Sequence, residues 1–185
     1  REKDLNDNKV NSVKADFSMH FKPWANDTEI ILQYKLGLGN TIYQGANRYA
    51  LNDFFMSQTK IEIKGKNFFA RAYRSSENAG NSYDMRFAGW NVQRLAKSDT
   101  NWFTDYGTAF QLSSAALGLN ADEAANYART FADTNVSPGL NLVPNTDPKN
   151  PSAPRGARFE PGSPEFVSAL NSVKNNPDLT QGAKF

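Results

Sequence analysis

The ten residues Val13-Lys14-Ala15-Asp16-Phe17-Ser18-Met19-His20-Phe21-Lys22 decide the fold, because their side chains alternate strictly between apolar and polar. A period of two residues predicts a β-strand with one apolar and one polar face. Ten residues also suffice for a tilted strand to cross the apolar core of a bilayer. A sheet in a soluble protein alternates in the same way, so the pattern alone does not identify what covers the apolar face.

Three more segments of the N-terminal half follow this pattern, and the turns between strands alternate in length. The segments 23–27 and 65–67 are rich in Pro, Gly, Asn and Asp and predict tight turns, whereas residues 40–55 predict a long connection. Because successive strands reverse direction, both short turns lie at one end of the sheet. Outer-membrane barrels have this layout of short turns and long loops. The predicted antiparallel strands are residues 11–22, 28–39, 56–65 and 67–75.

Aromatic residues gather at the end with the short turns, where an interfacial aromatic girdle is expected in a membrane protein. They are Phe21, Trp24, Phe68 and Phe69. The pattern predicts an all-β fold: a transmembrane antiparallel β-barrel segment of about four strands, with a long extracellular loop that contains short α-helices. We expect barrel strands and hairpins in residues 1–75 and the loop region in 76–185.

Two helices are predicted inside the loop region by their capping residues. Asn120 followed three residues later by Glu123 has the spacing of a capping box, which predicts a helix near 121–133. Ser163 followed by Pro164 is a typical helix start and predicts a helix near 164–175.

The composition excludes several classes of function. The 185 residues include 21 basic and 19 acidic residues, and this balance is not that of a nucleic-acid-binding domain. Cysteine is absent and His20 is the single histidine, so we expect neither a thiolate nor a multi-histidine metal site. No run of apolar residues is long enough for a membrane helix. Phosphate-binding loops, nucleophile elbows and other catalytic motifs are also absent, so we expect no enzyme, no catalytic residue and no cofactor.

Two groups of residues are candidates for a binding role. The first group lies on the polar faces of the strands and is expected to face the lumen, where pairing with neighbouring strands is a simpler explanation for these residues than ligand binding. It consists of Asp16, His20, Gln33, Lys35 and Arg71. The second group consists of aromatic and basic residues near the bases of the long loops and is expected to contact a ligand, although Trp90 could instead belong to a small loop core. It consists of Tyr43, Arg48, Tyr49, Trp90 and Arg94.

The segment Tyr43-Gln44-Gly45-Ala46-Asn47-Arg48-Tyr49 resembles a loop of TonB-dependent outer-membrane receptors of the Bacteroidetes type. Residues 65–73 and 77–84 are similar to the next hairpin and loop of that family. The resemblance implies energised import of a scarce nutrient at the cell outer membrane, with the loops extracellular. It implies contact with outer-membrane lipid and suggests a surface lipoprotein as a partner. It does not identify the nutrient.

A complete receptor of this family has an N-terminal TonB box, a plug domain and a barrel of about 22 strands. We therefore expect the chain to be an internal fragment, with the residues that contact the TonB complex in parts of the parent chain outside it. An alternative is a soluble β-rich binding or adhesion domain on the cell surface without a transport role. A third and weaker alternative, a secreted carbohydrate-active enzyme, lacks a recognisable pair of carboxylates. The first two differ in what covers the apolar strand face: lipid in a receptor, a protein core in a soluble domain.

Overall fold

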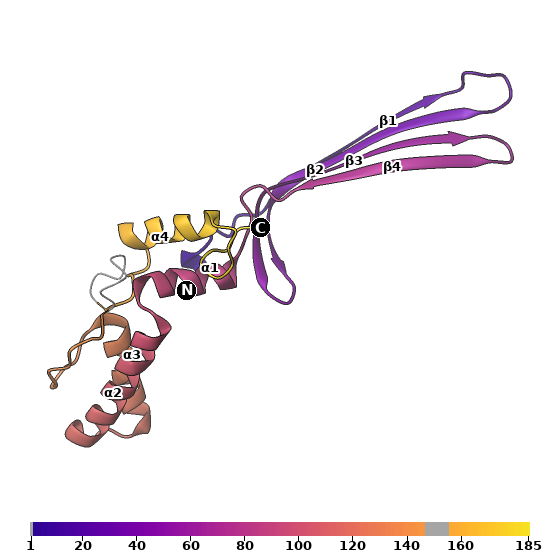
Figure 1. Ribbon diagram of the computed structural model, residues 1–185. Coiled ribbons are helices and arrows are strands. Elements are labelled where there is room, and N and C mark those ends of the chain that lie inside the picture. Colours follow the sequence, from indigo (N-terminus) through magenta and orange to yellow (C-terminus); the bar gives the residue numbers. More distant parts are fainter. Residues whose placement is uncertain (1, 147–155) are drawn as a thin grey trace. The chain divides into compact units, whose positions relative to one another are not determined.

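The computed structural model describes residues 2–146 and 156–185 (Figure 1). The chain divides into two compact units, which are described separately. The sheet unit comprises residues 6–86 and 183–185, and the helical unit comprises the described residues up to Leu5 together with 87–182.

An antiparallel sheet with the strand order β1-β2-β3-β4 forms the sheet unit. Each strand pairs with its neighbour in sequence, so the prediction of consecutive antiparallel hairpins is confirmed. The short fifth strand β5 pairs with Tyr49 and Ala50 of β3, close to the turn between β2 and β3. The strands are β1 (Asn11–Phe21), β2 (Glu29–Gln44), β3 (Arg48–Lys64), β4 (Phe69–Asn78) and β5 (Tyr83–Asp84).

The predicted long connection over residues 40–55 is wrong, because β2 and β3 continue through it and meet in a short turn. A β-bulge interrupts the alternation there: Asn52 and Asp53 on β3 stand opposite Asn40 alone on β2. Asp53 has a positive φ of 55°, and its backbone N–H donates to the Asn40 side chain at 2.7 Å. The extra residue breaks the period of two and gives the segment the appearance of a loop. Beyond the bulge, the β2–β3 hairpin turns away from the four-stranded part (Figure 1).

The expected all-β fold of a transmembrane barrel segment is also wrong. The described residues contain four α-helices besides the sheet, so the fold is mixed α and β. The sheet is open, because β1 and β4 each pair on one side only within the described residues. The alternating pattern ends near residue 78, and four strands are too few to close on themselves. The regular elements from residue 85 onward are α-helices.

Two of the four helices, α2 and α3, form a hairpin in the helical unit. Ser98 caps the start of α2, and Gly118 ends it in the left-handed conformation with φ of 66°. Ala109, Ala128 and Phe131 form the core of the hairpin. The helices are α1 (Met85–Ala96), α2 (Asp99–Leu117), α3 (Ala121–Thr134) and α4 (Pro164–Asn175), preceded by a single 3-10 turn, Glu2–Asp4.

Helices α3 and α4 coincide with the two windows expected from their caps. The Asn120 side chain accepts hydrogen bonds from the backbone of Asp122 and Glu123, while the Glu123 carboxylate accepts one from the Asn120 backbone. Ser163 accepts from the backbone N–H of Phe166 at 3.1 Å and thereby satisfies one of the free donors at the start of α4.

Candidate ligand-binding face

The polar face of the sheet is continuous across all four long strands. Asp16, Lys35, Gln58 and Ser75 stand directly opposite one another in the ladder and form one polar row from β1 to β4. The neighbouring row contains Ser18, Gln33, Lys60 and Tyr73, and the next contains His20, Ile31, Glu62 and Arg71. The five residues expected to face a lumen therefore all lie on this one face.

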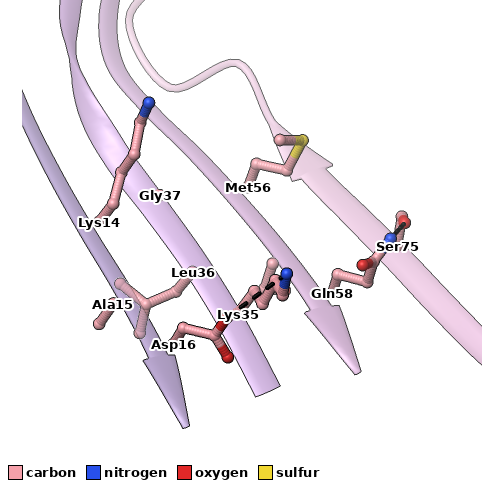
Figure 2. A pocket seen from close by; sticks show the side chains of 10 residues that line it. Lys14, Ala15, Asp16, Lys35, Leu36, Gly37, Met56, Gln58 and Ser75 are labelled. Atoms are coloured by element: carbon pink, nitrogen blue, oxygen red, sulfur yellow. Dashed lines mark hydrogen bonds and ion pairs between the residues drawn. The ribbon is translucent and has the colours of Figure 1, made fainter. Parts of the chain in front are cut away.

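A hollow of about 490 Å³ opens on the polar row (Figure 2). Gly37 contributes to it because it has no side chain between Lys14 on β1 and Met56 on β3, the two residues that flank it in the sheet. Figure 2 shows the polar groups that remain around the hollow. Its lining residues are Lys14, Ala15, Asp16, Lys35, Leu36, Gly37, Met56, Ser57, Gln58 and Ser75.

Four polar groups of the hollow, those of Asp16, Lys35, Gln58 and Ser75, are paired but accessible. The Lys35 ammonium group lies 3.4 Å from the Asp16 carboxylate, and both side chains are about half exposed. The Gln33 amide donates to the same carboxylate at 3.1 Å, and the Gln58 amide donates to the Ser75 hydroxyl at 3.2 Å. These weak, solvated pairs can exchange partners at low cost, so the hollow can offer donors and acceptors to a polar ligand.

Nearer the short turns, two stronger networks fix the polar face. The Ser18 hydroxyl lies 2.9 Å from His20 Nε2, and His20 Nδ1 lies 2.8 Å from the Glu29 carboxylate. Arg71 donates to the Glu62 carboxylate at 2.8 Å. His20 and Arg71 thus hold neighbouring strands together, which agrees with the pairing alternative given above.

Three of the expected ligand contacts lie at the β2–β3 hairpin. The rings of Tyr43 and Tyr49 are stacked with their centroids 6.1 Å apart, and Phe185 packs on Tyr49 at 5.0 Å. Tyr43 remains 57% exposed. Arg48 stands opposite Gln44 at the end of the ladder. The structure therefore brings the two tyrosines together as a small aromatic surface.

The other two expected contacts lie on α1 in the helical unit. The Arg94 guanidinium lies over the ring of Trp90, 5.8 Å from its centroid, and donates to Asp99 at 2.9 Å. Phe87 packs edge-on against Trp90 at 5.8 Å. Trp90 takes part in this local aromatic contact and is 43% exposed. The five expected contacts thus form two clusters, one in each unit.

Sequence reasoning did not identify Lys14, Met56, Gln58 and Ser75 as a site. The alternation places Lys14 and Gln58 on the polar face, but the hollow depends on the register that puts Gly37 between Lys14 and Met56. Ser75 is the last residue of the predicted strand 67–75, and its place in the polar row becomes clear because β4 continues to Asn78.

Comparison with protein-family models, with curated protein sequences and with solved structures found no match to this chain. Among the helices that the structure describes, none has both the length and the apolar composition needed to cross a membrane. Within residues 2–146 and 156–185, no group of His, Asp and Glu side chains is arranged to hold a metal ion.

Proposed function

We propose that the chain is part of a TonB-dependent outer-membrane receptor that imports a nutrient ligand across the outer membrane. In this proposal the apolar face of the sheet contacts outer-membrane lipid and the polar face contacts the ligand on its aqueous path. The helical unit lies on the extracellular side, and the TonB complex binds parts of the parent chain outside this segment. A surface lipoprotein is a further candidate partner.

The observation that carries the proposal is the exposed apolar face of the sheet. Phe17 is 64% exposed and Met19 57%, although both lie within the strand β1. A contiguous apolar surface over three strands is larger than soluble monomers normally leave uncovered, so it needs an apolar partner. The exposed apolar residues of this face are Val13, Phe17, Met19, Phe21, Leu32, Tyr34, Leu38, Phe55, Ile61 and Ile63.

The opposite face supports the second half of the proposal. A path for a polar nutrient requires accessible donors and acceptors, and the Asp16–Lys35–Gln58–Ser75 row provides them around the hollow. Within the sheet unit, the aromatic surface of Tyr43 and Tyr49 supplies apolar contact area for a ligand.

This sequence contains no cysteine, so single cysteine substitutions within it test the proposal directly. Phe17→Cys and Ser18→Cys are neighbours on β1 and point to opposite faces. After labelling with an environment-sensitive fluorophore, brominated lipid should quench the label at position 17. A water-soluble quencher should act on the label at position 18.

The soluble-domain alternative makes a different prediction for the same two variants. A label at position 17 would then be buried in a protein core and quenched by neither reagent, or it would be exposed and quenched by the water-soluble one. Either result would contradict the receptor proposal, whereas loss of whole-cell ligand binding after deletion of residues 97–177 would support the assignment of the helical unit to ligand capture.

A further inference from the structure

Two neighbouring turns place lysines and aromatic rings at one end of the sheet. The turn between β1 and β2 contains Lys22 and Trp24, and the turn between β3 and β4 contains Lys66 and Phe68. Glu29 stands opposite Lys64, and Lys64 stands opposite Phe69, so the two turns lie at the same end of the ladder. We call this surface the basic turn end; it consists of Lys22, Trp24, Lys64, Lys66, Phe68 and Phe69.

The three lysines of the basic turn end have no ion-pair partner among the described residues. The carboxylates nearest to them are already held: Glu29 by His20 at 2.8 Å, and Glu62 by Arg71 at 2.8 Å and Lys60 at 3.3 Å. The described residues provide no ion pair for Lys22, Lys64 or Lys66, and all three are exposed. The remaining acid in these turns, Asp27, does not balance three positive charges.

The register brings Lys22 and Lys64 to neighbouring positions at this end of the sheet. Lys64 stands opposite Glu29, and Lys22 follows Phe21, which stands opposite Ile30. At the turn between β3 and β4, a hollow of about 460 Å³ is lined by Lys64, Lys66 and Arg71 together with Phe68 and Phe69. Its single carboxylate, Glu62, already bonds to Arg71.

The aromatic rings at this end are directed to the surface and not into a core. Trp24 is 56% exposed, Phe68 57% and Phe69 70%. The Phe68 ring lies over Gly65, where a Cβ atom would come within 2.3 Å of it, so the turn holds this ring in place. Exposed aromatic rings interleaved with lysines are typical of surfaces that lie at the boundary between the headgroups and the acyl chains of a membrane.

We propose that the basic turn end binds the anionic headgroups of phospholipid, with the ammonium groups of Lys22, Lys64 and Lys66 on the lipid phosphates and Trp24 and Phe68 in the headgroup layer. This inference rests on the proposed function, because it specifies which lipids one end of the membrane-facing sheet selects. A neutral lipid surface would provide apolar contact for the rings but no counter-charge for the three lysines. Charge complementarity therefore favours an anionic lipid surface.

Vesicle binding by the whole chain tests this inference. Phosphatidylcholine vesicles serve as the neutral probe, and phosphatidylcholine mixed with phosphatidylglycerol serves as the anionic probe. Each lysine near an anionic surface is worth about a fivefold change in affinity. We therefore expect Lys22→Gln/Lys64→Gln/Lys66→Gln to weaken binding to anionic vesicles by at least about tenfold, and we expect rising salt to weaken wild-type binding.

Two control variants distinguish the effect of positive charge at this end on vesicle binding from the effects of net charge and of misfolding. The triple Arg variant of the same positions should keep the preference for anionic vesicles. The variant Lys3→Gln/Lys9→Gln/Lys184→Gln changes net charge equally outside the basic turn end, and it should bind as the wild type does. Trp24→Ser/Phe68→Ser should weaken binding to both kinds of vesicle.

The inference would be overturned if wild-type protein bound neutral and anionic vesicles equally, if it bound neither, or if the two Gln triple variants lost binding to the same extent. Equal binding to both kinds of vesicle would leave intact the lipid contact at Phe17 that the cysteine experiment measures. Failure of the headgroup preference is therefore distinguishable from failure of the proposed receptor function.

Discussion

The ammonium group of Lys97 contacts the carboxylate of Asp105 inside the helical unit, where both side chains are almost completely shielded from solvent. Lys97 also donates to the carbonyl of Ala132 at 3.0 Å, and Asp105 accepts two hydrogen bonds from Asn145, one from its backbone and one from its side chain. The pair thereby links α2, the end of α3 and the segment that follows. A fully bonded buried ion pair is tolerated, whereas half of one is not.

We predict that Asp105→Asn destabilises the helical unit by about 3–5 kcal/mol, because it leaves the Lys97 charge buried without a counter-charge. The double variant Lys97→Met/Asp105→Asn removes that charge and keeps an acceptor for Asn145, so it should recover most of the loss. Urea unfolding followed by far-ultraviolet circular dichroism measures both. A cost below about 1 kcal/mol for the single variant would show that the pair is not buried in solution.

The close approach of β2 to β1 at Gly39 gives a second prediction. A Cβ atom at Gly39 would lie 2.2 Å from the backbone oxygen of Asn11, whereas one at Gly37 would meet nothing closer than 4.0 Å. Gly39→Ala should therefore cost about 1–3 kcal/mol by forcing β1 away from β2. Gly37→Ala should change stability by less than about 0.5 kcal/mol.

Hydrogen exchange locates the effect of these two variants. Gly39→Ala should speed amide exchange at the start of β1, near Asn11, and Gly37→Ala should not. Equal exchange in both variants would mean that the close approach of Gly39 to Asn11 is absent in solution.

The sheet could be predicted in large part because its determinants are local. The alternation from Val13 to Lys22 and the Gly65-Lys66-Asn67 turn each act within one hairpin, so they predict strands and their pairing. The bulge at Asp53 could not be predicted in this way, because it depends on a side chain from the opposite strand, that of Asn40. The transmembrane barrel segment was inferred from the alternation, the strand lengths, the turn layout and the aromatic residues at one end, and none of these determines how many strands a sheet contains.

The sequence predicts which face of the sheet carries the candidate site, but it does not predict where on that face the site lies. A period of two residues correctly groups Asp16 with His20 on one side of β1, but the hollow arises from the alignment of Gly37 with Lys14 and Met56 across three strands. The two aromatic clusters show the same limit. Their members were chosen by residue type, and the stacking of Tyr43 on Tyr49 follows from the hairpin register.

A third prediction concerns the start of α4. Ser163→Ala removes the acceptor for the Phe166 backbone N–H and should destabilise the helix by about 1 kcal/mol. Ser168→Ala, in the exposed interior of the same helix, should be neutral or slightly stabilising, since Ala has the higher helix propensity. Thermal unfolding of the two variants gives the comparison. A capping role for Ser163 would be refuted by equal melting temperatures.

The last prediction concerns alkaline pH and rests on Tyr83. This side chain is 1% exposed, and burial raises the pKa of its hydroxyl to about 12. The unfolded chain ionises Tyr83 near its usual pKa of about 10, and the folded protein keeps it neutral up to about 12. Because the folded pKa is the higher one, the contribution of Tyr83 to stability is complete below pH 10 and is lost as the pH rises toward 12.

The loss should amount to at most about 2.7 kcal/mol, since two pKa units separate the folded and unfolded states. Tyr83→Phe removes the ionisable group and should flatten the fall in stability over this range, at a small cost at neutral pH from its hydrogen bond to Asn6. Tyr73→Phe, at a residue that is 69% exposed, should leave the alkaline fall unchanged. Urea unfolding at a series of pH values measures all three proteins. An equally steep fall in the Tyr83→Phe variant would assign the alkaline transition to other groups.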